Sequence, residues 1–519
     1  MIELNRREVA FGTLLAASGL ATTKAFAAPS GNATIAMPTM GEQTFLPWTG
    51  STGRKFYLDT ICEYLAYIDP ATQELKPGLA ESWAYSADGK TITLKIRQGV
   101  PFQRDMGLFT SADAKYSLDR MRDPKATAGP SSPLRAAIDS VEAPDATTLV
   151  IKLKQPDIEF VRAYLSNGLS VAMVSKAYVE KVGDEEANAK PVGTGAYQLD
   201  DFRKDISIRV KVVANVASHW RNKEPGFETL TFRAAPEQST RVAMLQTGEA
   251  DLAPIAYDSI ATLKKAGLNV LSVKNAWTPL IRMGGLTLKF PNANVPWAKE
   301  KVRQALNLAI DKQAIVKEIF QGEGSVASTD FWSKEGAAVA PYPYDPAKAK
   351  QLLAEAGYPN GFDIEIKSYT TVPGAELPGI AEAVAMFWQA IGVRVKIAPT
   401  DWGTVRGAWT SGKATDVVWV HRGFPFPAAL AGYEAGYQSA SLFASYATAE
   451  VDQQIDAIRA AVEPAGREKA TIALAQSLRD QAANVFIAHV NEPYGTSKKI
   501  KSWPSLSEQV TNMDLITRA

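Results

Sequence analysis

The chain has little cysteine and histidine and almost no net charge. Of its 519 residues, one is cysteine and three are histidine, and 56 basic residues balance 55 acidic ones. A single cysteine, Cys62, excludes a disulfide within the chain, and we expect its thiol to be a small buried apolar group. A near-neutral balance gives no electrostatic attraction for nucleic acid, so we expect no nucleic-acid partner.

Long apolar runs are also missing. Beyond the N-terminus, no stretch reaches the ~18 uninterrupted apolar residues of a transmembrane helix. At the N-terminus, Arg6-Arg7 precede a modestly apolar run, 9–21, and then the tripeptide A-F-A at 25–27, which has the pattern of a signal-peptide cleavage site. Paired arginines are typical of twin-arginine export. We therefore expect residues 1–27 to be a cleaved signal peptide. Because no cysteine lies at the cleavage site to carry a lipid, we expect a free periplasmic protein.

The sequence lacks the motifs of common hydrolases and nucleotide-binding proteins. Neither H-E-x-x-H nor G-x-S-x-G occurs. His219, His421 and His489 are far apart in the sequence and show no spacing typical of a metal site. The stretch 407–413, G-A-W-T-S-G-K, resembles a phosphate-binding loop, but Ala414 follows where Ser or Thr would bind magnesium. We expect no catalysis, no cofactor and no metal.

Regular patterns of strands and helices are present throughout. The Asp88-Gly89 pair lies between alternating apolar residues and predicts a tight hairpin. The alternation over 91–97 predicts a strand with one buried face, and 208–212 shows the same pattern. A chain of this length also exceeds a single hydrophobic core, so two or three domains are expected.

A helix–glycine–strand unit occurs once in each half of the chain. In the first, a helix over 237–247 ends at Gly248 and a strand follows over 251–255. The second spans 405–420, with Gly412 between helix and strand. Glycine is favoured just past a helix end because it adopts a positive φ without a Cβ clash. Helices interleaved with strands in this way predict an α/β protein with two lobes.

Five segments, in this order and spacing, resemble a known family. They are L-K-P-G-L-A-E-S-W with the hairpin after it (75–121), P-V-G-T-G-A-Y-Q-L (191–199), the helix–glycine unit (241–253), a helix pair (302–324) and a capped helix (344–362). The set is similar to the extracellular solute-binding proteins of family 5, which serve ABC importers of dipeptides, oligopeptides and nickel. The segments look structural, consisting of turns, helix caps and packing faces.

The resemblance implies a two-lobed periplasmic binding protein fold of the large three-subdomain type, with a hinge between the lobes. It implies that residues 28–50, 190–275 and 490–519 form subdomain I, 51–189 subdomain II, and 276–489 the second lobe. The implied function is to capture a peptide or peptide-like solute by lobe closure and to deliver it to a membrane permease. The implied partners are the permease and its ATPase subunits, with contact to the membrane only through the permease and a monomeric chain.

Aromatic and polar residues that could contact a solute occur at three places. These are Gln43, Phe45 and Trp48 after the first strand, Trp277 and Arg282 at the crossing into the second lobe, and Trp419, His421, Arg422 and Phe424 in W-V-H-R-G-F-P-F-P (419–427). The third place combines stacking, hydrogen bonding and anion pairing. Peptide-binding members of the family typically carry an aspartate shortly after this tryptophan. Arg422 stands at or beside that position, which favours an anionic or zwitterionic ligand.

Other readings of the sequence stay open. Some members of the family carry nickel or haem, so a metal-chelate or haem carrier of the same fold is one alternative. Another is an exported hydrolase, and a third is a periplasmic chaperone or receptor adaptor that takes no part in transport. For Trp419 and Arg422 themselves, the alternatives to ligand binding are a core position and a solvated surface charge.

Overall fold

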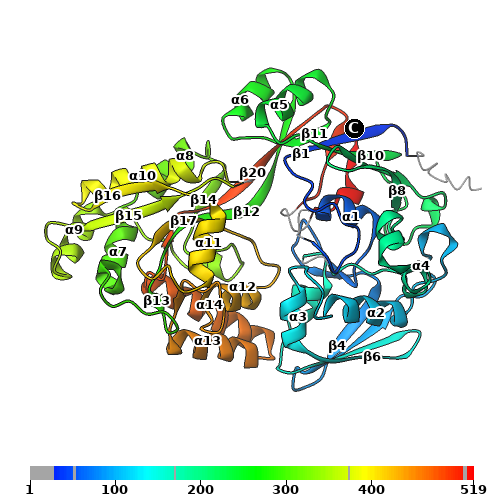
Figure 1. Ribbon diagram of the computed structural model, residues 1–519, viewed down its shortest axis with the longest axis horizontal. Helices are drawn as coiled ribbons and strands as arrows, with labels where there is room; N and C mark the ends of the chain where they lie inside the picture. The colour runs from blue at the N-terminus through cyan, green and yellow to red at the C-terminus, as the bar shows by residue number, and fades with distance from the viewer. Residues whose placement is uncertain (1–28, 51–53, 169–170, 372–373, 506–510) are drawn as a thin grey trace, which may run out of the picture.

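The computed structural model describes residues 29–50, 54–168, 171–371, 374–505 and 511–519, so the expected signal peptide lies outside the described residues. Two lobes lie side by side (Figure 1). Lobe 1 holds the helices and strands from β1 (Asn32–Met37) to α6 (Ser259–Lys265) and the C-terminal residues, and lobe 2 holds those from β13 (Leu286–Thr287) to β19 (Val485–Phe486). In the described ranges, no helix has both the length and the apolar character needed to span a bilayer.

One mixed sheet of twelve strands runs through both lobes. Its order is β16 (Arg394–Pro399), β15 (Asp363–Ser368), β17 (Val418–Gly423), β12 (Asn269–Met283), β20 (Ala488–Thr496), β11 (Leu252–Pro254), β1 (Asn32–Met37), β10 (Thr229–Ala234), β9 (Ser207–Val212) and β8 (Tyr197–Arg203), with β14 (Gly324–Val326) and β19 (Val485–Phe486) off this path. β12 and β20 are the strands that cross between the lobes (Figure 1).

The crossing strands change partners at an irregularity in β12. Asn269 to Val273 pair with β20, and the register then shifts before Trp277 pairs with Val490. Beyond that point β12 pairs with β17 in lobe 2, from Thr278 to Met283. Asn275 lies in the gap with a φ of 50°, and its N–H donates to Asn491 Oδ1 at 3.1 Å. The two strands therefore form a hinge in which side-chain hydrogen bonds replace part of the regular ladder.

Lobe 1 contains a separate antiparallel sheet built on the predicted hairpin. Its order is β4 (Ala80–Tyr85), β5 (Thr91–Ile96), β7 (Thr148–Leu153) and β6 (Ile138–Asp145). Gly89 turns the chain with a φ of 67°, and Tyr85 pairs with Ile92 beyond it. The three alternating apolar residues of β5, Ile92, Leu94 and Ile96, are fully buried. The hairpin and its buried face are thus confirmed. Helices α1 (Lys55–Ile61), α2 (Ser111–Met121), α3 (Ser131–Ala137), α4 (Lys176–Ala189), α5 (Gln238–Thr247) and α6 (Ser259–Lys265) complete the lobe.

Lobe 2 is built largely from helices. They are α7 (Glu300–Leu308), α8 (Lys312–Glu318), α9 (Pro346–Glu355), α10 (Leu377–Ala390), α11 (Trp402–Thr410), α12 (Ala429–Tyr437), α13 (Ala449–Ala460) and α14 (Pro464–Asp480). Asp311 and Asp345 cap α8 and α9 by accepting backbone N–H groups, as predicted. The strand predicted from residue 416 begins at Val418 instead, because residues 415–416 form a turn in which the N–H of Val417 donates to the carbonyl of Ala414.

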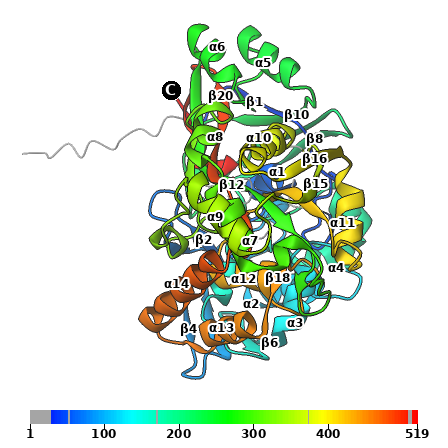
Figure 2. The same cartoon turned by 90° about the vertical axis from the view of Figure 1, so that its left-hand side faces the viewer.

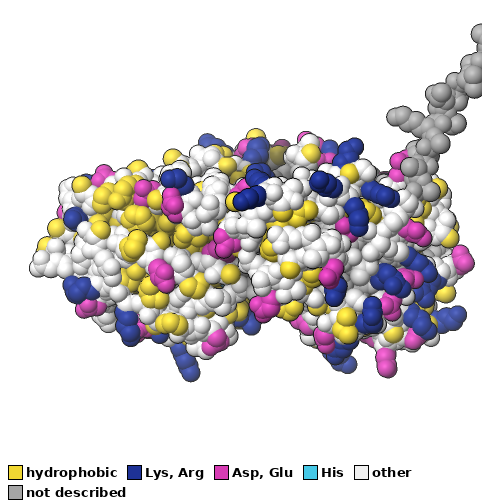
Figure 3. Space-filling model, turned by 90° about the horizontal axis from the view of Figure 1, so that it is seen from above, with side chains coloured by type: hydrophobic (Ala, Val, Ile, Leu, Met, Phe, Trp, Pro, Cys, Tyr) yellow, Lys and Arg dark blue, Asp and Glu magenta, His cyan; other side chains and the backbone are white. Residues whose placement is uncertain are grey.

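The far ends of the two lobes approach each other. The helix pair α13 and α14 lies at the same end of the molecule as the antiparallel β4–β7 sheet in both ribbon views (Figures 1 and 2). Seen from above, charges of both signs are interspersed over the surface, and hydrophobic side chains gather mainly on the left-hand half (Figure 3).

Candidate functional site

A cavity of ≈ 730 Å³ lies where the two lobes and the hinge meet. Lobe 1 contributes Ile68, Thr72, Gln73, Glu74, Glu159 and Arg162, the hinge contributes Lys274 and Asn275, and lobe 2 contributes residues 332–335, 425–427 and Ala429. The volume is in the range of small-molecule and peptide sites. Because both lobes supply walls, a solute held here would touch both of them only in this closed arrangement.

The lobes also touch directly beside the cavity. Arg162 Nε of lobe 1 donates to the carbonyl of Pro427 in lobe 2 at 2.6 Å. Arg467 of α14 lies between Asp157 and Glu159 of lobe 1, with N–O distances of 3.4 and 3.2 Å. These contacts hold the lobes together at the mouth of the cavity.

Two of the three predicted places come together in lobe 2. The β12–β17 register places Arg282 opposite Trp419. The Arg282 guanidinium lies 4.8 Å from the ring centroid of Trp409 and pairs with Asp330 at 3.2 Å. The Trp419 ring, which is fully buried, lies 5.3 Å from the same Trp409 ring. Arg282 and Trp419 therefore pack in the interior of lobe 2, and they are not among the described residues that line the cavity.

Arg422 and its aromatic neighbours precede the part of the chain that lines the cavity, and they are not among the described residues of its lining. The Arg422 guanidinium carbon is 5.6 Å from the ring centroid of Trp277 and 4.8 Å from that of Phe424. Trp277 is 2% exposed and Phe424 46% exposed, so the group extends from the core to the surface of lobe 2. Pro425, the next residue, is the first in this segment to line the cavity. Burial raises the pKa of the nearby Glu376 carboxyl, and the Arg422 charge offsets part of that rise.

His421 supplies no charge to this group. Its Nδ1 lies 3.2 Å from the hydroxyl of Tyr369, and its ring packs at a tilt of 38° against that of Trp402 with a centroid distance of 5.6 Å. Burial, together with the positive charges of Arg282 and Arg422, holds the pKa of His421 well below its usual value. The imidazole is neutral, which leaves Arg422 and Arg282 as the permanent charges of the two places.

The structure separates the first predicted place, which holds Gln43, Phe45 and Trp48, from the other two. Gln43 Nε2 donates to Asp205 Oδ1 at 2.5 Å in the turn between β8 and β9. Phe45 packs on Tyr57 of α1 with a ring separation of 5.3 Å. Trp48 lies under the Arg120 guanidinium of α2 at 4.1 Å. All three side chains are buried in lobe 1. They fasten the loop after β1, and they are not among the described residues that line the cavity.

Several cavity residues were missed by the sequence analysis. Lys274 and Asn275 precede the predicted Trp277 by two or three positions, and Phe426 lies inside the predicted stretch 419–427. Trp332 and its neighbours, and Arg162, come from segments with no local signal for binding. Phe426 packs against Phe331 with a ring separation of 5.4 Å, which fixes the aromatic part of the wall.

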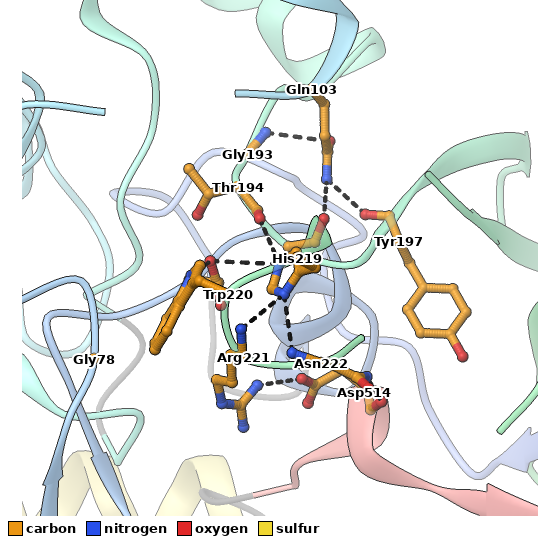
Figure 4. Close-up of polar contacts among 12 residues, drawn as sticks. Gly78, Gln103, Gly193, Thr194, Tyr197, His219, Trp220, Arg221, Asn222 and Asp514 are labelled. Atoms are coloured by element: carbon orange, nitrogen blue, oxygen red, sulfur yellow. Dashed lines mark hydrogen bonds and ion pairs between the residues drawn. The ribbon is translucent and has the colours of Figure 1, made fainter. Parts of the chain in front are cut away.

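A second polar cluster lies inside lobe 1, away from the cavity (Figure 4). Trp220 Nε1 donates to Glu63 Oε2 at 2.9 Å, and Arg221 pairs with Asp514. Burial raises the pKa of Glu63, and the neighbouring His219 and Arg221 offset part of that rise. The cluster joins α1, the loop after β9 and the C-terminal residues, so its role is to hold lobe 1 together.

The glycines of P-V-G-T-G belong to the same structural cluster. A Cβ on Gly193 would lie 2.1 Å from the carbonyl oxygen of Ile61, and one on Gly195 would lie 2.4 Å from that of Thr60. Gln103 Nε2 donates to the carbonyls of this layer, including that of Tyr197 at 2.7 Å (Figure 4). The motif is glycine-rich because two backbones touch here.

Comparisons with known proteins agree with this architecture. Residues 74–444 match the family described as bacterial extracellular solute-binding proteins, family 5 Middle. The glutathione-binding protein GsiB of Shigella boydii serotype 4 (strain Sb227) is 36% identical over 382 residues, which cover 72% of this chain and 70% of GsiB.

Solved structures show the same two-lobed fold. NikA from Brucella suis, in complex with Fe(III)-EDTA, has a TM-score of 0.80 at 19% identity, covering 94% of this chain and 100% of NikA. The dipeptide-binding protein from Pseudoalteromonas sp. SM9913, in complex with Met-Leu, has a TM-score of 0.75 at 21% identity, with coverage of 94% and 100%. The α/β, two-lobed fold expected from the sequence is confirmed.

Proposed function

Because this chain belongs to the bacterial extracellular solute-binding proteins of family 5, we propose that its interlobe cavity captures a peptide or peptide-like solute for an ABC importer. The family and the neighbouring structures are binding proteins and not enzymes. The observation that carries the proposal is the ≈ 730 Å³ cavity, whose walls come from both lobes and the hinge. The solute therefore gains its full set of contacts only when the lobes close.

Closure is the step that couples binding to transport. A ligand that touches both walls binds the closed state more tightly and shifts the open–closed equilibrium toward it. The closed surface is then the form that the permease recognises, and ATP hydrolysis belongs to the partner subunits. We propose that the protein does this as a monomer in the periplasm after export by the twin-arginine route.

The solute we favour carries an acidic group. Arg422 is a permanent cation between two aromatic rings, just before the strip of chain that lines the cavity. The relative GsiB is named for glutathione, a tripeptide with two carboxylates and one ammonium group. Glutathione and acidic peptides are therefore the first solutes to test. A metal-chelate carrier is not favoured, because the likeness to NikA, at 19% identity, concerns the fold alone.

The subdomain boundaries implied by the sequence resemblance stay part of the proposal. The sheet topology supports them: β1, β8 to β11 and part of β20 lie within 28–50, 190–275 and 490–519, and the separate β4–β7 sheet lies within 51–189. Strands β14 to β17 and β19 lie within 276–489. We propose these ranges as subdomains I and II and the second lobe.

The experiment is calorimetric titration of the purified protein with reduced glutathione and with Met-Leu, before and after Arg422→Met. We expect binding of at least one of the two, and a loss of about tenfold for the acidic solute in the variant. Arg406→Met is the matched control, since Arg406 is an exposed arginine of α11 in the same lobe. Unchanged glutathione affinity in Arg422→Met, with a normal unfolding temperature, would remove Arg422 from the site. If the wild-type protein binds neither solute nor any other peptide, the function itself is wrong.

A further inference from the structure

We propose that Lys274 and Glu335 are the two charged poles of the cavity, and that its solute is a zwitterion whose carboxylate meets Lys274 and whose ammonium group meets Glu335. This assignment rests on the proposed function. It concerns residues outside the three places that the sequence analysis selected, and it names the charge pattern of the solute.

The argument begins with the charges on the cavity wall. Six charged side chains line it: Glu74, Glu159, Arg162, Lys274, Lys334 and Glu335. Three are cationic and three are anionic, so the wall as a whole is neutral. The electrostatic attraction that a solute meets in the cavity then depends on which of these charges already have partners in the protein.

Two of the lobe 1 carboxylates are already paired. Glu74 Oε2 lies 2.6 Å from Lys76 Nζ. Glu159 Oε2 lies 3.2 Å from the Arg467 guanidinium, in the contact that joins the lobes. Their negative charge is therefore offset by a neighbouring cation before any solute enters.

Two of the cations are also engaged. Lys334 Nζ lies 3.2 Å from Glu468 Oε1. Arg162 donates from Nε to the carbonyl of Pro427 at 2.6 Å and from Nη1 to that of Gln73 at 2.9 Å. Arg162 is thus used to hold the wall together across the lobes.

Lys274 and Glu335 are the remaining two of the six charged side chains on the cavity wall. Neither side chain makes a hydrogen bond or an ion pair with another described residue, and Arg162 acts on Glu335 only through a longer-range electrostatic attraction. Lys274 is exposed and stands on β12 in the hinge, one residue before Asn275. Glu335 is half-buried at the start of the short 3₁₀ turn Gly336–Ala338 in lobe 2.

The surroundings of these two residues fit an amphipathic zwitterion. Trp332 and Phe426 provide apolar wall between charged groups, against which the body of a small peptide can pack. The cation stands on the hinge and the carboxylate on lobe 2, so the solute's opposite charges would bridge separate elements of the closed cavity. A solute charge of opposite sign placed against each of them gains an electrostatic attraction that no direct ion pair in the protein already supplies.

The test crosses each side chain with the matching group of the solute. Affinities of reduced glutathione and Met-Leu are compared with those of their N-acetylated and C-terminally amidated forms, by calorimetry, in wild type, Glu335→Gln and Lys274→Met. We expect the wild type to lose roughly tenfold on acetylation and on amidation. Glu335→Gln should abolish the acetylation effect and keep the amidation effect, and Lys274→Met should do the reverse.

Lys334→Met and Glu74→Gln are the matched controls, because both residues line the same cavity but are paired elsewhere. They should keep both effects. If the wild type binds peptides and both variants keep the wild-type discrimination, the assignment of the poles is wrong and the proposed function stands. If the wild type binds none of these solutes and no other peptide, the proposed function fails and the assignment fails with it.

Discussion

Replacing Arg467 with methionine should weaken solute binding without unfolding the protein. Arg467 belongs to α14 in lobe 2, and its guanidinium contacts Asp157 Oδ1 and Glu159 Oε2 of lobe 1 at 3.4 and 3.2 Å. These contacts exist only while the lobes are closed. Their removal therefore destabilises the closed state relative to the open one.

The size of the effect follows from the exposure of the three side chains. Arg467 is 6% exposed, whereas Asp157 is 19% and Glu159 24% exposed. Breaking a fully buried pair costs about 3–5 kcal/mol, and exposed pairs contribute about 0–1 kcal/mol. A buried arginine with two partly exposed partners lies between these values, at about 1–2 kcal/mol. At about 1.4 kcal/mol per factor of ten, solute affinity should fall about 5- to 30-fold.

The assay is calorimetry with the solute that the wild type binds, accompanied by small-angle scattering of the free and bound forms. The matched control is Arg459→Met, because Arg459 pairs with Glu434 at 2.7 Å inside lobe 2. The control should bind like the wild type. The reasoning is refuted if Arg467→Met binds normally, or if both variants weaken binding equally.

Three other outcomes are expected. Burial raises the pKa of the Asp157 carboxyl to about 6 in the folded protein, so the folded state holds this proton more tightly than the unfolded state does. The contribution of Asp157 to the free energy of unfolding should therefore be greatest at low pH and be lost as the pH rises through about 6, and Asp157→Asn should flatten this part of the pH profile in thermal unfolding. Gly193→Ala should destabilise the fold by about 3 kcal/mol or more in thermal unfolding, because of the carbonyl 2.1 Å from the new Cβ. Gly436→Ala in α12, with open space around it, should not destabilise the fold. Burial raises the pKa of the Cys62 thiol to about 12, so iodoacetamide should label it only after denaturation, and labelling of the native protein at pH 8 would contradict this.

Elements with strong local signals were predictable residue by residue. The Asp88-Gly89 hairpin, the caps at Asp311 and Asp345, and the helix end at Gly248 all appear where the sequence places them. Each depends on the backbone preferences of two to four neighbouring residues. Interactions of such short range can be predicted directly from the sequence. The start of β17 was predicted less accurately, since the turn at residues 415–416 precedes the strand.

The candidate site depended on contacts between distant segments. Arg282 and Trp419 come together only through the β12–β17 register. Trp48 looked like a ligand contact but lies in the core of lobe 1, because Arg120 of α2 covers it. Lys274 looked like an ordinary solvated charge in the sequence. It lines the cavity because the hinge places it there.

The sequence by itself determined the family, the two-lobed α/β class and the local turns and caps, because these follow from motif order and from short-range backbone chemistry. Only the tertiary structure decided which side chains face the cavity and which charges are already paired. Both depend on how the lobes close over Arg162, Lys274 and Glu335, which are far apart along the chain. No pattern within a single segment encodes that closure.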